Sequence, residues 1–136
     1  MSLCPLNEPN TFKINGVCVM FVDQKKSFNS AQSYCQSKNG RLFEPRSVQT
    51  NNLVAEKGHQ VLNNNAMWFG IILKNGKSGP WKFATSGENI VQTMWEPGQP
   101  NDGSIEICGY YQTGGYGTKW WVVPCSRARR FICEFV

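Results

Sequence analysis

The chain has 136 residues, of which 40% are hydrophobic, and it carries a formal net charge of +5. This length fits one domain spanning 1–136, and the 17 Phe, Trp and Tyr residues (8, 5 and 4) supply large side chains for a core. No run of 18 or more apolar residues occurs, so the sequence predicts no membrane span.

The cysteines indicate the redox compartment. There are six of them and a single histidine, and no two cysteines have the CxxC spacing of a zinc site. An even number without metal spacing favours three disulfides and a secreted or extracellular protein. A reduced cytosolic protein with buried thiols is the alternative, and the sequence alone does not choose among the pairings.

The first elements are a hairpin and a helix. Asn15-Gly16 stands between the apolar runs 12–14 and 17–22, which predicts a tight β-hairpin. Ser27 can cap a helix over 27–38, where apolar residues recur at helical spacing and place Cys35 on the buried face.

A second helix is predicted over 48–57. Ser47 can cap it, Leu53 and Val54 are expected to face inward, and Gly58 is expected to end it. His59 follows that glycine and is expected at the surface, since no nucleophile motif accompanies it.

The rest of the chain reads as strands around an irregular middle. The predicted strands cover 42–43, 67–73, 107–111, 119–123 and 130–136. The segment 74–101 is rich in Gly, Pro, Ser and Asn, and a long irregular segment in a compact domain is usually functional. Two early helices followed by antiparallel strands predict an α+β fold.

An ordered set of residues resembles the C-type lectin-like domain family. The set comprises Phe28, Ala31, Cys35, Gly40, Leu42, Trp68-Phe69-Gly70-Ile71, Trp95, Gln99-Pro100-Asn101, Cys108, Trp120, Cys125 and Phe131-Ile132-Cys133-Glu134. The match extends from Cys4 to Glu134. The resemblance implies the C-type lectin-like fold and a binding module that is not an enzyme. It also implies three disulfides, Cys4-Cys18, Cys35-Cys133 and Cys108-Cys125.

The resemblance also implies a ligand site. Gln99 and Asn101 align with the family's calcium-binding triplet around a proline that is usually cis, here Pro100. Glu106 stands where the family has a carboxylate ligand, and Asp102 where some members hold an auxiliary calcium. Calcium takes six to eight oxygens, for which amides and carboxylates are suitable. The alternative is that this segment is a polar surface turn.

The site departs from the family pattern in the predicted strand 119–123. Trp120 takes the place of the family's tryptophan, but Trp121 and Val122 replace its Asn-Asp ligand pair and offer no side-chain oxygen. Gln99, Asn101 and Glu106 with one backbone carbonyl fall short of six oxygens. Calcium is therefore expected to bind weakly or to be dispensable.

Aromatic residues take the place of the lost ligands. Strand alternation puts Trp120 in the core and turns Trp121 toward the family's ligand surface. Tyr116 lies among glycines and is expected to face solvent. Exposed aromatic rings can stack on a sugar or anchor a protein partner.

These residues predict an extracellular carbohydrate-recognition domain of atypical C-type lectin type. The alternative is a calcium-independent protein-binding module on the same surface. Ice binding ranks low because no flat Thr-rich face is visible. The oligomeric state stays open, a homodimer included.

Two basic spots add to the surface charge. They are Lys25-Lys26 and the group Arg127, Arg129 and Arg130. Neither has the length or the interleaved aromatics of a nucleic-acid site. Solvated charge is the favoured interpretation, with binding of an anionic glycan or lipid as the alternative.

Overall fold

A computed structural model gives the fold, and it describes residues 4–74, 79–101, 106–113 and 117–136. The elements are β1 (Thr11–Ile14), β2 (Val17–Lys26), α1 (Phe28–Ser37), β3 (Arg41–Leu42), α2 (Val48–Val61), β4 (Met67–Leu73), β5 (Lys82–Phe83), β6 (Ile107–Tyr111), β7 (Trp120–Pro124) and β8 (Arg129–Phe135). The predicted α+β class and all three predicted disulfides, Cys4–Cys18, Cys35–Cys133 and Cys108–Cys125, are confirmed.

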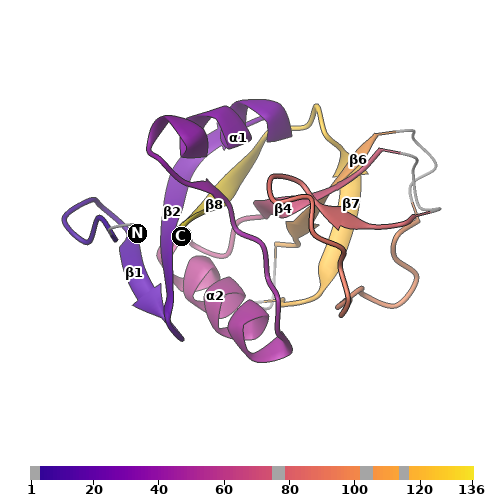
Figure 1. Ribbon diagram of the computed structural model, residues 1–136, viewed down its shortest axis with the longest axis horizontal. Coiled ribbons are helices and arrows are strands. Elements are labelled where there is room, and N and C mark those ends of the chain that lie inside the picture. The colour runs from indigo at the N-terminus through magenta and orange to yellow at the C-terminus, as the bar shows by residue number, and fades with distance from the viewer. Residues whose placement is uncertain (1–3, 75–78, 102–105, 114–116) are drawn as a thin grey trace.

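One mixed sheet organises the molecule, with strand order β1-β2-β8-β4-β6-β7. Neighbours are antiparallel except for a short parallel contact of β4 with β8. The helices α1 and α2 lie on opposite sides of β2 and β8 (Figure 1). Among the described residues, no helix is long and apolar enough to cross a membrane.

The local signals at the start of the chain are confirmed. Asn15 and Gly16 have φ of 49° and 81°, the left-handed values that a two-residue hairpin turn requires between β1 and β2. The Ser27 hydroxyl accepts a hydrogen bond from the Ser30 N–H at 3.3 Å and so caps α1. Cys35 is fully buried on the inner face of α1.

The prediction that Gly58 ends the second helix is wrong, because α2 continues to Val61. Gly58 faces β4 instead. A Cβ there would lie 2.6 Å from Met67 Sδ and 2.9 Å from the Phe21 ring, so a larger residue would require these side chains to shift. The glycine serves packing and not termination.

Two further expectations for α2 are also wrong. Leu53 is 41% exposed, and His59 is completely buried. The buried stripe of α2 consists of Thr50, Asn51, Val54, Ala55, Gly58 and His59. This stripe mixes apolar and polar side chains, so hydrophobic spacing alone misplaces its edge.

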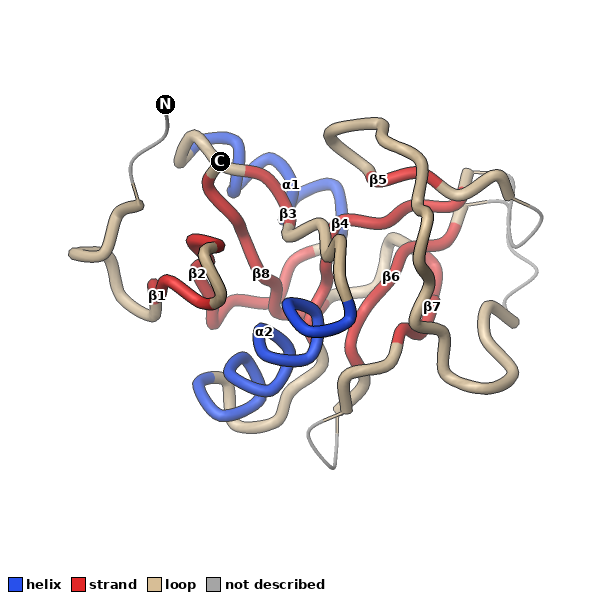
Figure 2. The backbone as a smooth tube through the Cα atoms, turned by 60° about the horizontal axis from the view of Figure 1, so that its bottom comes forward, coloured by secondary structure: helices blue, strands red, loops and turns tan. Residues whose placement is uncertain are grey.

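The core has two clusters, one on each face of the sheet. The α2 side contains Phe69, Tyr111 and Trp120, and the α1 side contains Trp68 and the Cys108–Cys125 disulfide. β5 is not predicted from the sequence, because its two residues lie in the segment 74–101, whose Gly, Pro, Ser and Asn content indicates irregular structure; it pairs with β4. Figure 2 shows β5, β6 and β7 gathered with the long loops at one end of the molecule.

Candidate functional site

The segment 94–99 runs along the outer edge of β7. The Trp120 N–H donates to the Met94 carbonyl at 2.8 Å, and the Glu96 N–H donates to the Trp120 carbonyl at 3.1 Å. Two residues further along β7, the Val122 N–H donates to the side-chain Oε1 of Gln99 at 3.2 Å. The Gln99 amide therefore occupies the place of a backbone carbonyl in this ladder.

The structure places Gln99 of the predicted triplet beside β7. The peptide bond before Pro100 is cis, as expected from the resemblance. Asn101 and Glu106 are both exposed. Asp102 and Tyr116, the other two predicted ligand-binding residues, lie outside the described residues.

The donor set at this place does not fit a calcium ion of the family type. Trp121 and Val122 supply no side-chain oxygen, and the Gln99 oxygen already accepts the β7 hydrogen bond. Among the described residues, Asn101, Glu106, one backbone carbonyl and the second lone pair of Gln99 Oε1 remain, against the six to eight oxygens that calcium takes. In the part of the chain that the structure describes, no group of three or more His, Cys, Asp or Glu residues could hold a metal.

Trp121 faces the opposite side of β7 from Trp120, as strand alternation predicts. Trp120 is fully buried, whereas Trp121 is half-buried and packs against the cluster on the α1 side. Its cross-strand neighbour is Tyr110. Part of the Trp121 surface is thus exposed, and Trp121 is next in sequence to the Val122 that Gln99 contacts.

Asn51 on α2 holds β7 from its buried side. Its Oδ1 accepts hydrogen bonds from the Tyr111 hydroxyl at 2.6 Å and from Trp120 Nε1 at 2.9 Å. Its Nδ2 donates to the Thr118 carbonyl at 2.8 Å. Burial raises the pKa of Tyr111 well above its usual range, so the hydroxyl remains a donor. The signal for Asn51 is its helical spacing with Val54.

His59 also contacts the segment that leads into β7, at the residue before Thr118. Its Nε2 lies 2.8 Å from the Gly117 carbonyl oxygen, and since a carbonyl only accepts, Nε2 donates. Burial lowers the pKa of His59, and the bond to Gly117 opposes this shift. The two polar side chains of α2 therefore set the position at which β7 begins.

A buried carboxylate anchors the loop that follows β5. Glu44 Oε2 accepts from the backbone N–H groups of Thr85 and Ser86 at 3.1 and 3.0 Å. Its Oε1 pairs with Arg46 Nη2 at 2.9 Å, and Arg46 Nε reaches Glu88 at 3.1 Å. The Arg46 hydrogen bond lowers the pKa of Glu88. The loop is thus joined to the connection between β3 and α2.

Glu134 on β8 completes this ionic group. It accepts a short hydrogen bond from the Glu44 N–H and lies 3.6 Å from Arg41 Nη2. Burial raises the pKa of Glu134, although the Glu44 N–H and the arginines act in the opposite direction. Glu44 and Glu134 were missed at the sequence level, because only the fold brings their partners together.

Three tryptophans tie the irregular segment to the core. The Trp95 ring lies edge to face with Trp81 and Trp120, at centroid distances of 5.3 Å in both pairs. Such aromatic pairs add about 0.5–1.5 kcal/mol each beyond burial. The segment before Gln99 is therefore held in place by packing as well as by the β7 ladder.

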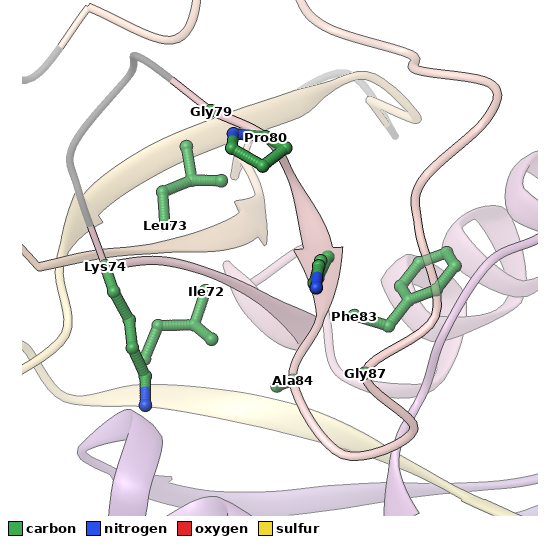
Figure 3. A pocket seen from close by; sticks show the side chains of 9 residues that line it. Ile72, Leu73, Lys74, Gly79, Pro80, Phe83, Ala84 and Gly87 are labelled. Carbon is green, nitrogen blue, oxygen red and sulfur yellow. The ribbon is translucent and has the colours of Figure 1, made fainter.

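A cavity of about 400 Å³ lies between β4 and β5. Figure 3 shows the Leu73 side chain directed toward Pro80, while Ile72 and Lys74 extend to the other side of β4. None of the described ligand-binding residues predicted from the sequence lines this cavity. It is therefore separate from the Gln99 edge.

Comparisons with known proteins agree with this fold. The family model for the lectin C-type domain matches residues 24–135. Human C-type lectin domain family 3 member A is 32% identical over 125 residues, covering 90% of this chain and 61% of that protein. C-type lectin lectoxin-Phi2 from Philodryas olfersii is 28% identical over 127 residues, covering 91% of this chain and 80% of its own length.

Among solved structures, the mouse scavenger receptor C-type lectin carbohydrate-recognition domain has the same fold. It superimposes with a TM-score of 0.79 at 22% identity, covering 96% of this chain and 94% of that one. Together with the match over 24–135 and the three disulfides, the arrangement of two helices on a mixed sheet shows that the chain belongs to the C-type lectin domain family.

Proposed function

We propose that residues 1–136 act as one extracellular recognition domain that binds carbohydrate directly, with calcium weak or dispensable. The observation that carries this proposal is the hydrogen bond from the Val122 N–H to Gln99 Oε1. The side-chain oxygen of Gln99, the first residue of the triplet, is thus hydrogen-bonded within the protein. The three disulfides support an extracellular location, since such bonds persist in oxidising compartments.

The chemistry left at the site suits a sugar. Exposed Asn101 and Glu106 supply hydrogen-bonding groups, and Trp121 presents part of an aromatic face. A sugar ring offers hydroxyls to the former and its C–H face to the latter. Asp102 and Tyr116 remain predicted members of the same surface. The similar mouse domain is described as a carbohydrate-recognition domain, which supports this ligand class.

A protein ligand is the second candidate. Trp121 and Val122, which offer no side-chain oxygen, favour it, because a surface without metal ligands can bind a protein partner directly. Neither function requires catalysis, and we propose that the domain is not an enzyme.

A glycan array separates these functions. Wild-type protein is probed in calcium and in chelator, together with Trp121→Ala, Glu106→Gln and the exposed control Val48→Ala. Direct carbohydrate binding predicts hits that survive chelator, are lost in Trp121→Ala and weaken in Glu106→Gln, and persist in Val48→Ala. Hits that vanish in chelator would overturn the calcium-dispensable part, and an array empty under both conditions would favour a protein ligand.

A further inference from the structure

A second pocket lies away from the Gln99 edge. It has a volume of about 230 Å³ and is formed where β2 ends, β8 begins and β6 leaves the sheet. Its polar lining consists of Lys25, Asn65, Gln112, Thr113, Arg129 and Arg130. It shares no lining residue with the proposed carbohydrate surface. Three of these six side chains are cationic, so both of the basic spots in the sequence contribute to one pocket.

Arg129 is held in place by aromatic rings. Its guanidinium carbon lies 5.1 Å from the centroid of the Tyr110 ring and 6.0 Å from that of Trp68. Both rings are buried, and they contact each other edge to face. Trp68 is fixed in turn, because its Nε1 donates to the Lys26 carbonyl at 2.9 Å. A guanidinium stacked in this way keeps its N–H groups directed outward from its rim.

The donors of Arg129 are only partly used. Nη1 donates to the Ala128 carbonyl at 3.0 Å, and the enclosed Nε has no acceptor among the described residues. An arginine has five N–H donors. Because Nε is enclosed and one Nη1 donor is used, the donors left for a ligand are the other three, on Nη1 and Nη2. A carboxylate or sulfate can accept two parallel hydrogen bonds from such a group.

The charges around the pocket do not balance within the described part of the chain. Arg130 is paired with Asp23 through a short ion pair, whereas Lys25 and Arg129 form no ion pair with any described residue. Two positive charges therefore stand without a counterion among the residues that the structure describes. They leave a local positive potential at the pocket, which attracts an anion.

The remaining lining suits hydroxyl groups. Asn65 Nδ2 donates to the Leu62 carbonyl at 2.7 Å, which leaves its side-chain oxygen as an acceptor. Gln112 Nε2 donates to the Tyr110 hydroxyl at 3.3 Å. Amide and cationic groups around a small volume match one charged sugar residue better than an extended polymer.

We propose that this pocket binds the sulfate or carboxylate group of an acidic saccharide. Arg129 donates to the oxyanion from its ring-stacked position, Lys25 adds a second charge, and Asn65 accepts from a sugar hydroxyl. The inference does not depend on the function of the Gln99 edge, because the two surfaces have no residue in common.

The test is a titration of the intact protein followed by two-dimensional NMR of the backbone amides. The probes are galactose 6-sulfate and glucuronic acid, with galactose and glucose as their neutral counterparts. We expect both acidic sugars to shift the amides of Gln112, Thr113 and Arg129, and the neutral sugars to leave these amides in place. Glu106→Gln should leave this binding unchanged, which separates it from the proposed carbohydrate surface.

Variants test the named side chains. Arg129→Gln should weaken binding about tenfold or more through loss of charge-assisted hydrogen bonds. Lys25→Gln, on an exposed side chain, should weaken it as well and remains informative if Arg129→Gln fails to fold. The matched control is Arg127→Gln, which removes the same charge from an exposed residue outside the pocket lining.

Three results would overturn the inference. An equal loss in Arg127→Gln would mean that net charge alone attracts the sugars. Inorganic sulfate binding as tightly as galactose 6-sulfate would assign the pocket to a free oxyanion. Tighter binding of tetraglutamate than of either acidic sugar would assign it to an acidic peptide.

Discussion

The side-chain oxygen of Gln99 accepts a hydrogen bond from the backbone N–H of Val122 at 3.2 Å. These two residues stand where C-type lectins that bind calcium have two of their ligands, according to the resemblance. In this chain they contact each other instead. The Gln99 side chain, which the resemblance implies as a metal ligand, completes the edge of β7.

Returning oxygen donors to β7 should create a calcium site. In Trp121→Asn/Val122→Asp, two side-chain oxygens join those of Asn101 and Glu106. Gln99 Oε1 adds the lone pair that the backbone N–H of residue 122 leaves unused, so the set approaches the number that calcium requires. We expect millimolar calcium to raise the melting temperature of the variant and not that of the wild type. Saturation to 100 times the Kd would correspond to about 2.7 kcal/mol.

Val122 is buried, so a carboxylate there can prevent folding. The single variant Gln99→Glu, which adds a carboxylate at the edge of β7, is then used in place of the double variant. Magnesium is the control ion, since it requires a tighter octahedral arrangement. Calcium stabilisation of the wild type that disappears in Glu106→Ala would show instead that the natural residues already form a metal site.

Asn51 should be among the most sensitive positions outside the hydrophobic core. Asn51→Leu leaves the Tyr111 hydroxyl and Trp120 Nε1 buried without their acceptor. A buried group left without its partner costs about 1–3 kcal/mol, so we expect a loss of about 3 kcal/mol in the free energy of unfolding. Urea denaturation measures it. Gln49→Ala, on the exposed side of α2, should change stability by less than about 0.5 kcal/mol. Equal losses in the two variants would contradict the role of Asn51.

The disulfides should differ in their contribution according to the loops that they close. Cys35–Cys133 joins residues 98 apart in sequence, whereas Cys4–Cys18 joins residues 14 apart. Loop-closure entropy predicts a loss on the order of 4–5 kcal/mol for Cys35→Ala/Cys133→Ala and about 3 kcal/mol for Cys4→Ala/Cys18→Ala. Thermal unfolding under identical conditions ranks the two variants. The reverse order would show that residual structure in the unfolded chain dominates the effect.

Signals that act over a few residues were enough to predict much of the fold. The hairpin at Asn15-Gly16 and the cap at Ser27 depend on backbone preferences and on a hydrogen bond to the third residue along the chain. The disulfides and the cis Pro100 came from the family resemblance. Both kinds of prediction are confirmed.

Roles that depend on distant partners could not be predicted in this way. Gly58 looks like a helix end until the fold places Met67 and Phe21 against it. Gln99 offers a free amide in the sequence, but Val122, 23 residues later, uses its oxygen. In each case the chemistry of the residue is unchanged and its partner decides its role.

The pH dependence of stability should contain a contribution from His59. Burial lowers its pKa in the folded protein below the ordinary 6.5, so the unfolded chain takes up a proton at a higher pH than the folded one. As the pH falls below about 6.5, the unfolded state binds more protons and the free energy of unfolding decreases. His59→Gln does not titrate, and its amide can still donate to the Gly117 carbonyl.

The measurement is urea denaturation of the wild type and His59→Gln between about pH 7.5 and 5. Glu134, whose pKa is raised by burial, has the opposite sign: its stabilising contribution is lost as the pH rises above about 4.5. Because Glu134 is present in both proteins, its contribution cancels in the difference. We expect the wild type to lose stability relative to His59→Gln as the pH falls. Parallel curves would mean that His59 takes up its proton equally in both states, and so that its burial against Gly117 does not persist in solution.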